Sequence, residues 1–383
     1  MPLSTGDELW MQRAVELAAR GEGRVEPNPM VGCVLVSGSG ENAGQLLGEG
    51  YHQRFGEPHA ERMAIADATR RGNRQRLAGA TAYVTLEPCC HYGKTPPCTD
   101  ALLEAGIRRV VVALADPFAQ VAGRGLELLR QAGVSVELGP GADEARQLNA
   151  PYLKRLLTGR PWVIAKWAMS LDGKLATHCG DSQWITGPAS RAEVQRLRGR
   201  VDAIVVGRRT AQLDNPRLTA RTPEPPLRTA WRVVIDSQLQ LPLDSQLVAT
   251  AQQTPVLLAC GPEASTAAAQ ALRQRGCHIF QSPKVDRQQR LDALLQYLAQ
   301  ELAATNVLVE GGGELLGSLF DLRQLDQCEV FIAPKLIGGV HAVSPLAGVG
   351  LERLSAGPTT YARRVQTCGD DVHVSLRLGW PDS

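Results

Sequence analysis

The sequence has little that would suit a protein that binds nucleic acid or a membrane. Its 383 residues carry a formal net charge of only +2, and aromatic residues make up 4% of the chain. Binding to a phosphate backbone needs clustered positive charge, and binding to single strands needs aromatic side chains on which bases stack. The chain also lacks a run of about 18 apolar residues and the apolar core of a signal peptide. These absences argue against nucleic acid and membrane partners.

The cysteines and the length limit the class of protein further. The nine cysteines are odd in number and scattered along the chain, which does not suit a disulfide framework. We therefore expect reduced thiols and a cytoplasmic location. With 383 residues, of which 44% are hydrophobic, the chain can build two cores. No internal repeat or low-complexity tract is evident, so we expect two ordinary globular domains.

Residues 59–98 hold the clearest chemical pattern. His59 and Glu61 lie one residue apart, and Cys89, which follows Pro88, and Cys98 come later in the chain. Three protein ligands leave the fourth tetrahedral position of a zinc ion open for water. Zinc lowers the pKa of that water, and a glutamate that is not a ligand then carries protons to the leaving ammonia. The pattern predicts a zinc-dependent base deaminase with ligands His59, Cys89 and Cys98 and with Glu61 as the proton shuttle.

Two expected helix starts would bring these groups together. Pro58 can start a helix over residues 59–70, and a second helix is expected at 99–105, directly after Cys98. On the first helix His59 and Glu61 would lie about 200° apart around the axis, so both can reach a metal only if the helix points its N-terminus at it. Two helix N-termini aimed at one point favour thiolate ligands.

Two alternatives remain for this region. Cys90 could be the ligand in place of Cys89, because adjacent residues at a strand end point in different directions and only one should face the metal. We choose Cys89 because it follows Pro88. The other alternative is that these residues are a histidine at an ordinary helix start and buried thiols of a reduced protein.

The spacing of the two cysteines differs from the Pro-Cys-x-x-Cys of nucleoside and tRNA deaminases. Eight residues separate Cys89 from Cys98, and they end in Gly93-Lys94-Thr95-Pro96-Pro97. This resembles the bifunctional riboflavin-biosynthesis deaminase/reductase family, whose deaminase domain carries a Gly-(Lys/Arg)-Thr-Pro-Pro-Cys insertion. The likeness extends to residues 27–32, 50–52, 116–117 and 121–125. The resemblance implies four contacts to the deaminase substrate: Asn28, His52, His91 and Lys94.

This chain departs from the family pattern at two positions. Many members have a second histidine two residues after the glutamate, where this chain has Met63. Many have serine where this chain has Cys90. Neither position is needed to bind the metal, so the departures leave the expected chemistry unchanged.

The first half of the chain alternates between expected strands and helices. Strands are expected at residues 31–36, 81–86, 109–114 and 134–138, and a further strand ends at residue 51. Helices are expected at 7–20, 59–70, 99–105 and 123–132. This alternation predicts an α/β sheet covered on both faces. A helical linker is expected at 142–157. We place the boundary near residue 150, with a deaminase domain at 1–147, a linker at 148–160 and a second domain at 161–383.

In the second half, Gly311-Gly312-Gly313 lies between an expected strand at 306–310 and an expected helix at 314–320. Such a glycine-rich start of a helix lets backbone amides approach phosphate oxygens. It does not match Gly-x-Gly-x-x-Gly, because Leu316 stands where the last glycine would be. The alternative is a plain strand-to-helix turn. A polar loop is expected at 210–221.

This half resembles the reductase domain of the same family, which is related in fold to dihydrofolate reductase. The matching stretches are 170–173, 182–186, 214–221, 234–237 and 310–312. The resemblance implies that NADPH is bound by Ala168, Trp184, Thr210, Asp214, Ser237 and the loop of Gly312, Gly313, Glu314, Leu315, Leu316, Gly317 and Ser318. It implies that the ribosyl phosphate substrate is held by Ser182, Arg198, Leu218, Arg221 and Glu310. Arg198 and Arg221 could clamp the phosphate, because guanidinium groups bind phosphate in a bidentate manner.

We therefore expect an α/β protein with an N-terminal cytidine-deaminase-like zinc domain and a C-terminal dihydrofolate-reductase-like domain. The resemblance implies deamination of 2,5-diamino-6-(5-phosphoribosylamino)-4(3H)-pyrimidinone, followed by reduction of the ribosyl chain to ribityl with NADPH. It also implies a homo-oligomer formed through the reductase domain. Two other functions stay open: a tRNA or nucleoside deaminase with an accessory domain, and a zinc-stabilised binding protein whose second domain has lost catalysis.

Overall fold

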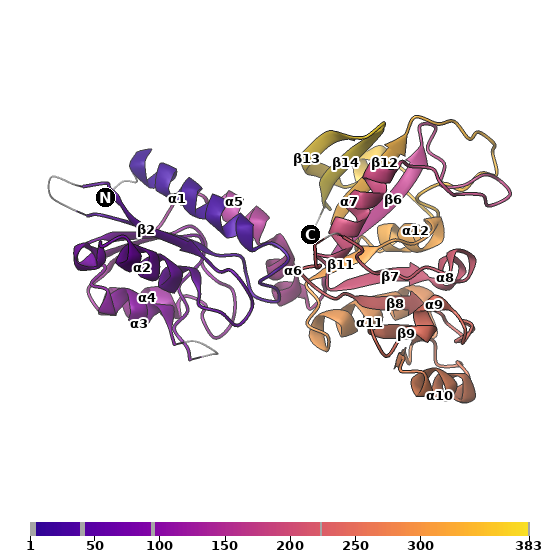
Figure 1. Ribbon diagram of the computed structural model, residues 1–383, viewed down its shortest axis with the longest axis horizontal. Coiled ribbons are helices and arrows are strands. Elements are labelled where there is room, and N and C mark those ends of the chain that lie inside the picture. The colour runs from indigo at the N-terminus through magenta and orange to yellow at the C-terminus, as the bar shows by residue number, and fades with distance from the viewer. Residues whose placement is uncertain (1–4, 39–42, 93–95, 223, 382–383) are drawn as a thin grey trace. The chain divides into compact units, whose positions relative to one another are not determined.

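The computed structural model describes residues 5–38, 43–92, 96–222 and 224–381 (Figure 1). The chain divides into two compact units, Met1–Gly159 and Arg160–Ser383. Lys94, one of the expected substrate contacts, lies outside the described residues. Within the described part of the chain, no helix is long and apolar enough to cross a membrane.

The first unit is built on a five-stranded sheet with the order β2-β1-β3-β4-β5. β1 is antiparallel to β2 and β3, whereas β3, β4 and β5 are parallel. The strands are β1 (Gly32–Val36), β2 (Leu46–Tyr51), β3 (Thr81–Val84), β4 (Arg109–Val112) and β5 (Ser135–Leu138). The helices are α1 (Thr5–Ala18), α2 (Ala60–Arg70), α3 (Cys98–Glu104), α4 (Arg124–Gln131), α5 (Ala142–Leu148) and α6 (Ala150–Thr158).

Both faces of this sheet are covered, as the alternation of strands and helices predicts. Cys33 and Leu35 of β1 pack in one core with residues of α2, α3 and α4, and Val34 and Val36 pack in another with residues of α1. The helices approach closely where the strands carry glycine. A Cβ atom on Gly50 would lie 2.5 Å from the backbone nitrogen of Ala64 in α2. This close packing of α2 on β2 fixes where the N-terminus of α2 lies.

The segment expected as one helical linker consists of two helices. α5 ends at Leu148, Asn149 lies between the helices, and α6 begins at Ala150. Pro151 stands in the first turn of α6, where its missing N–H costs nothing, but it could not continue the ladder of α5. Both helices are part of the first compact unit.

The second unit is built on a nine-stranded sheet with the order β10-β9-β8-β7-β11-β6-β12-β14-β13. The strands from β10 to β12 in this order are parallel, and β14 is antiparallel to β12 and β13. The strands are β6 (Trp162–Ser170), β7 (Ala203–Gly207), β8 (Trp231–Ile235), β9 (Val256–Cys260), β10 (His278–Gln281), β11 (Asn306–Val309), β12 (Gln327–Ala333), β13 (Thr359–Cys368) and β14 (Asp371–Gly379).

The helices of this unit are α7 (Pro188–Arg198), α8 (Arg208–Asp214), α9 (Gln246–Ala249), α10 (Thr266–Gln274), α11 (Arg287–Gln300) and α12 (Gly313–Asp321). The expectation of a loop throughout 210–221 is wrong, because α8 extends to Asp214. Only one residue of α8, Ala211, is buried, so this short helix shows no apolar stripe that could reveal it in the sequence.

Candidate functional site

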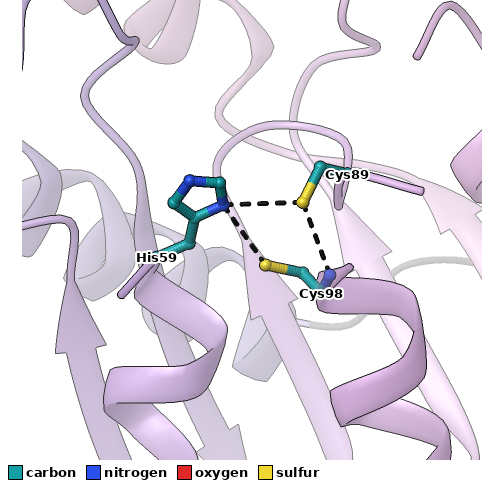
Figure 2. A group of neighbouring side chains, drawn as sticks. All are labelled: His59, Cys89 and Cys98. Atoms are coloured by element: carbon teal, nitrogen blue, oxygen red, sulfur yellow. Dashed lines mark hydrogen bonds between the residues drawn. The ribbon is translucent and has the colours of Figure 1, made fainter. Parts of the chain in front are cut away.

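His59, Cys89 and Cys98 come together in the first unit from three different segments of the chain (Figure 2). His59 is the N-cap residue of α2, Cys98 is the first residue of α3, and Cys89 lies in the segment after β3. His59 has extended backbone angles and is not part of the helix, so the angular separation expected for two helical residues does not apply. The approach from two helix N-termini is as expected.

The three donor atoms fit a zinc ion in spacing and in kind. The Nδ1 atom of His59 lies 3.5 Å from Cys89 Sγ and 3.4 Å from Cys98 Sγ, and all three atoms lie within 4.8 Å of one another. Tetrahedral coordination with ordinary zinc–sulfur and zinc–nitrogen bonds places such atoms about 3.6 Å apart. One imidazole and two thiols form a common zinc-binding set that leaves one position open.

The electrostatics at Cys89 favour a thiolate. Hydrogen bonds from the Cys98 thiol, from His59 and from the Cys98 backbone amide, which lies 3.4 Å from Cys89 Sγ, lower the pKa of Cys89 to about 4. The pKa of Cys98 is raised, because its thiol bonds to the Cys89 sulfur and is buried. Cys89 is thus the sulfur that loses its proton more readily, as a metal ligand must.

Glu61 lies in the first turn of α2 and is almost fully buried, with 3% of its surface exposed. Burial and the nearby Cys89 sulfur raise the pKa of this carboxyl group. The neighbouring His59 and Cys98 act in the opposite direction and lower this pKa. A carboxyl group with a raised pKa beside a metal set can accept and return a proton near neutral pH.

Cys90 is not part of this group. Its Sγ atom lies 3.7 Å from the carbonyl oxygen of Gln120, and burial raises the pKa of its thiol. Cys89 and Cys90 therefore point in different directions, and Cys89 is the one that faces His59 and Cys98.

Two of the expected substrate contacts form a pair next to the metal set. The Nδ2 atom of Asn28 lies 3.3 Å from His52 Nε2, and His52 Nδ1 lies 3.3 Å from the carbonyl oxygen of Pro58. These contacts suit a neutral imidazole that donates from Nδ1 and accepts at Nε2. Burial and the nearby His59 lower the pKa of His52, which also favours the neutral form. The His52 and His59 rings meet edge to face at 5.1 Å.

His91, the third expected substrate contact, has a buried Nδ1 atom with no hydrogen-bond partner among the described residues. Its ring lies 6.0 Å from that of Phe118. A buried polar atom without a partner is costly, so it is a natural contact for a bound ligand.

The second unit contains a cavity of about 1650 Å³ at the carboxyl ends of its parallel strands. This is where ligands bind in open α/β sheets. It exceeds the roughly 300–1,000 Å³ of a pocket for one drug-sized molecule, so two ligands can share it. The expected cofactor contacts that line it are Ala168, Trp184, Thr210, Asp214, Ser237, Gly312, Gly313, Glu314 and Leu315, and all the expected substrate contacts line it: Ser182, Arg198, Leu218, Arg221 and Glu310.

Three expected cofactor contacts, Leu316, Gly317 and Ser318, are not among the described residues that line the cavity. Leu316 is fully buried in the hydrophobic core, and the Ser318 hydroxyl donates to the carbonyl of Glu314. Gly317 faces another segment, since a Cβ atom there would lie 1.6 Å from the carbonyl oxygen of Ala347. The helix α12 turns these residues away from the cavity, and packing explains why Gly317 is glycine.

The two arginines of the expected phosphate clamp differ in whether a carboxylate already binds them. Arg198 is largely buried and forms a bidentate pair with Glu310, with nitrogen–oxygen distances of 2.6 and 2.9 Å. Burial opposes both charges, yet the pairing raises the pKa of Arg198 and lowers that of Glu310. Among the described residues, the Arg221 guanidinium group makes one long contact, 3.4 Å to the hydroxyl of Thr219. Arg221 is thus the clamp residue that a phosphate can reach without displacing a carboxylate.

Lys166 is a cavity residue that the sequence analysis missed. Its ammonium nitrogen lies 4.0 Å from Glu310 Oε2, and burial lowers its pKa. The signal that could have found it is the lysine itself, which stands inside the apolar run from Trp162 to Ala168. A lysine in a buried strand is rare unless it is paired.

Two family models match the chain: the RibD C-terminal domain over residues 161–374, and the cytidine and deoxycytidylate deaminase zinc-binding region over residues 4–114. The riboflavin biosynthesis protein RibD of Actinobacillus pleuropneumoniae is 40% identical over 363 residues, which cover 95% of this chain and 93% of that protein. The chain belongs to the RibD family. The RibD protein of Escherichia coli is also 40% identical, over 97% of this chain and 99% of that protein.

Solved RibD structures agree with this assignment. Acinetobacter baumannii RibD has a TM-score of 0.82 at 35% identity, and it covers 97% of this chain and 99% of that chain. A diaminohydroxyphosphoribosylaminopyrimidine deaminase/5-amino-6-(5-phosphoribosylamino)uracil reductase from Thermotoga maritima has a TM-score of 0.79 at 34% identity, with the same coverage. The chain is thus a bifunctional riboflavin biosynthesis enzyme with a deaminase and a reductase domain, and a nucleoside or tRNA deaminase with an accessory domain is not favoured.

Proposed function

We propose that the first unit hydrolytically deaminates 2,5-diamino-6-(5-phosphoribosylamino)-4(3H)-pyrimidinone and that the second reduces the ribosyl chain of the product with NADPH. The observation that carries the first reaction is the meeting of His59, Cys89 and Cys98 beside the buried Glu61. The named activities of the Thermotoga maritima relative support the choice of substrates.

In the deaminase unit, His59, Cys89 and Cys98 would hold zinc, which supplies the Lewis acidity that makes a water molecule reactive near neutral pH. Glu61 takes a proton from water and delivers it to the leaving amine, a role that its raised pKa suits. Asn28 and His91, whose Nδ1 atom has no hydrogen-bond partner among the described residues, hydrogen-bond the pyrimidine. His52 orients the Asn28 amide through its contact at 3.3 Å.

In the reductase unit, NADPH would supply the reducing equivalent, and the residues of the cavity orient the cofactor and the ribosyl chain. Arg221 binds the substrate phosphate, because it is the clamp residue whose side chain bonds to no carboxylate in the described part of the chain. Arg198 keeps Glu310 ionised, and Glu310 together with Lys166 holds polar atoms of the ribosyl chain.

Two substrates measured against two variants test this proposal. Glu61→Gln keeps the size and the zinc ligands but cannot accept a proton, so ammonia release should fall by about 10²–10⁴-fold. Reduction of the deaminated ribosylaminouracil phosphate should stay the same. Arg221→Ala should slow that reduction and leave ammonia release within about twofold, as expected for independent sites. Glu104→Gln, an exposed substitution at the end of α3, is the matched control for the deaminase unit.

The proposal fails if purified protein with bound zinc releases no ammonia from the diaminopyrimidine phosphate. That result would favour a zinc-stabilised binding protein. If Glu61→Gln abolished the reduction of the deaminated substrate, a shared site would replace the two independent ones.

Two further expectations belong to this proposal. The reductase should use NADPH in preference to NADH. Light scattering should show that the protein is a homo-oligomer and that the reductase domain expressed alone forms the same oligomer.

A further inference from the structure

Asn149 lies between α5 and α6, in the segment that sequence analysis assigns to a linker, yet it is 1% exposed. Its side-chain amide binds both backbone groups of Met30. The Oδ1 atom accepts from Met30 N at 2.8 Å, and Nδ2 donates to Met30 O at 2.9 Å. One side chain thus satisfies a donor and an acceptor of a residue 119 positions away in the chain.

Met30 lies in the loop that carries Asn28. The loop continues through Val31, whose carbonyl accepts from the backbone N–H of His52 at 2.9 Å. His52 in turn contacts Asn28 at 3.3 Å and meets the ring of His59 at 5.1 Å. Asn149 therefore holds the loop at one end of a chain of contacts that reaches the ligand histidine.

Asn149 is itself held firmly. Its backbone N–H donates to Ala145 O at 3.0 Å and its carbonyl accepts from Leu153 N at 2.9 Å, so both neighbouring helices fix it. Nearby in α6, the Tyr152 hydroxyl donates to Asp116 Oδ1 at 3.0 Å. Asp116 also accepts from the backbone N–H of Phe118, whose ring faces His91. The junction of α5 and α6 thus contacts both the loop of Asn28 and the segment of Asp116 and Phe118.

We propose that Asn149 is a positioning residue of the deaminase site, which sets the place of Asn28 and His52 through its paired hydrogen bonds to Met30. This rests on the proposed deaminase function. A side chain that only stabilised the fold would change the amount of folded protein. A positioning residue changes how well the folded enzyme binds its substrate.

The test compares Asn149→Leu, which keeps the branched shape of the side chain but removes both hydrogen bonds, with Asn73→Leu. Asn73 follows α2 and donates its side-chain amide to Leu47 O at 3.0 Å, at the opposite end of that helix from His59. The Asn149→Leu enzyme should show a KM for deamination raised by about 10- to 100-fold, as when buried polar groups lose a partner, and a much smaller change in kcat. Zinc content and reduction should match the wild type, and Asn73→Leu should leave KM unchanged.

A second variant and a measurement without substrate complete the test. Asn149→Asp keeps the acceptor and loses the donor to Met30 O, so it should also raise KM. This variant serves as the test if the leucine variant does not fold. Hydrogen exchange of the backbone at residues 27–31 should quicken in the Asn149 variants and not in Asn73→Leu. A wild-type KM in a folded Asn149 variant, or a loss confined to kcat, overturns the proposal. A wild type without deaminase activity instead refutes the proposed function, while the exchange data still report on the contact.

Discussion

The buried pair of Arg198 and Glu310 leads to a prediction that separates stability from substrate binding. Both residues are expected to bind the substrate, but the structure also makes them partners of each other. Removal of Arg198 leaves the Glu310 carboxylate buried, with Lys166 at 4.0 Å as a nearby cation. We therefore expect Arg198→Met to destabilise the reductase unit, whereas Arg221→Ala should not.

The magnitude follows from the geometry. The side chains of Arg198 and Glu310 are only 11% and 9% exposed, so solvent screens them little. Breaking a buried pair by removal of one partner costs about 3–5 kcal/mol. The two hydrogen bonds between charged groups, at about 1.5–3 kcal/mol each, give a similar figure. The exposed contact of Arg221 predicts a change within about 0.5 kcal/mol.

Urea unfolding followed by tryptophan fluorescence measures this difference. Five of the six tryptophans lie in residues 160–383, so the signal reports mainly on the reductase unit. With a slope of about 3 kcal/mol per molar urea, Arg198→Met should lower the midpoint by about 1–1.7 M. The double variant Arg198→Met/Glu310→Gln removes the stranded charge and should recover at least half of the loss while reduction stays impaired.

Two results would refute this reasoning. One is a midpoint for Arg221→Ala that falls as far as that for Arg198→Met. The other is a double variant no more stable than Arg198→Met, which would mean that the stranded carboxylate is not the source of the cost. An unchanged midpoint in every variant would show that the pair is not formed in solution.

Two further predictions concern the metal set and a surface carboxylate. Cys98→Ser should lose both zinc and deamination, whereas Cys90→Ser should keep both, as metal analysis and an ammonia-release assay measure. Zinc retained in Cys98→Ser and lost in Cys90→Ser would reassign the ligand. Hydrogen bonds from the Ser170 hydroxyl and from the Ile337 and Gly338 amides lower the pKa of Asp172 to about 2. Because this folded-state pKa lies below the ordinary value, the carboxylate stabilises the fold above about pH 4 and loses this effect as the pH falls toward 2. Protection of the two amides from hydrogen exchange should decline over that window in the wild type, and Asp172→Asn should show weaker protection at pH 7 and no such decline.

The deaminase chemistry was readable from sequence because its residues are rare types at a distinctive spacing. His59, Glu61, Cys89 and Cys98 stand at the starts of helices or after a strand, and local signals such as Pro58 and Pro88 mark those ends. A position at a helix start also determines much of where a side chain points. The alternation of strands and helices likewise predicts the α/β class, since each short element carries its own hydrophobic pattern.

Other features depend on contacts between distant segments. Nothing near Asn149 indicates that it binds Met30, because the hydrogen bonds join residues that only the folded sheet and helices bring together. The same holds for Glu310, whose partner Arg198 belongs to another helix. Pro88 favoured Cys89 over Cys90 as the ligand, but the direction in which each thiol points depends on the backbone path after β3, which the folded structure sets.

The sequence alone thus predicted which residue types would carry the chemistry, and it determined the order in which the elements follow one another. Hydrophobic period, helix-start residues and ligand spacing are local properties, because each depends on residues within a few helical turns of one another in the sequence. Tertiary structure decided the pairing of Arg198 with Glu310, the burial of Leu316 in the core and the contact between Asn149 and Met30. These features depend on burial. Where water is excluded, the loss of a partner from an ion pair or from a side-chain amide costs much more free energy than it does at the surface.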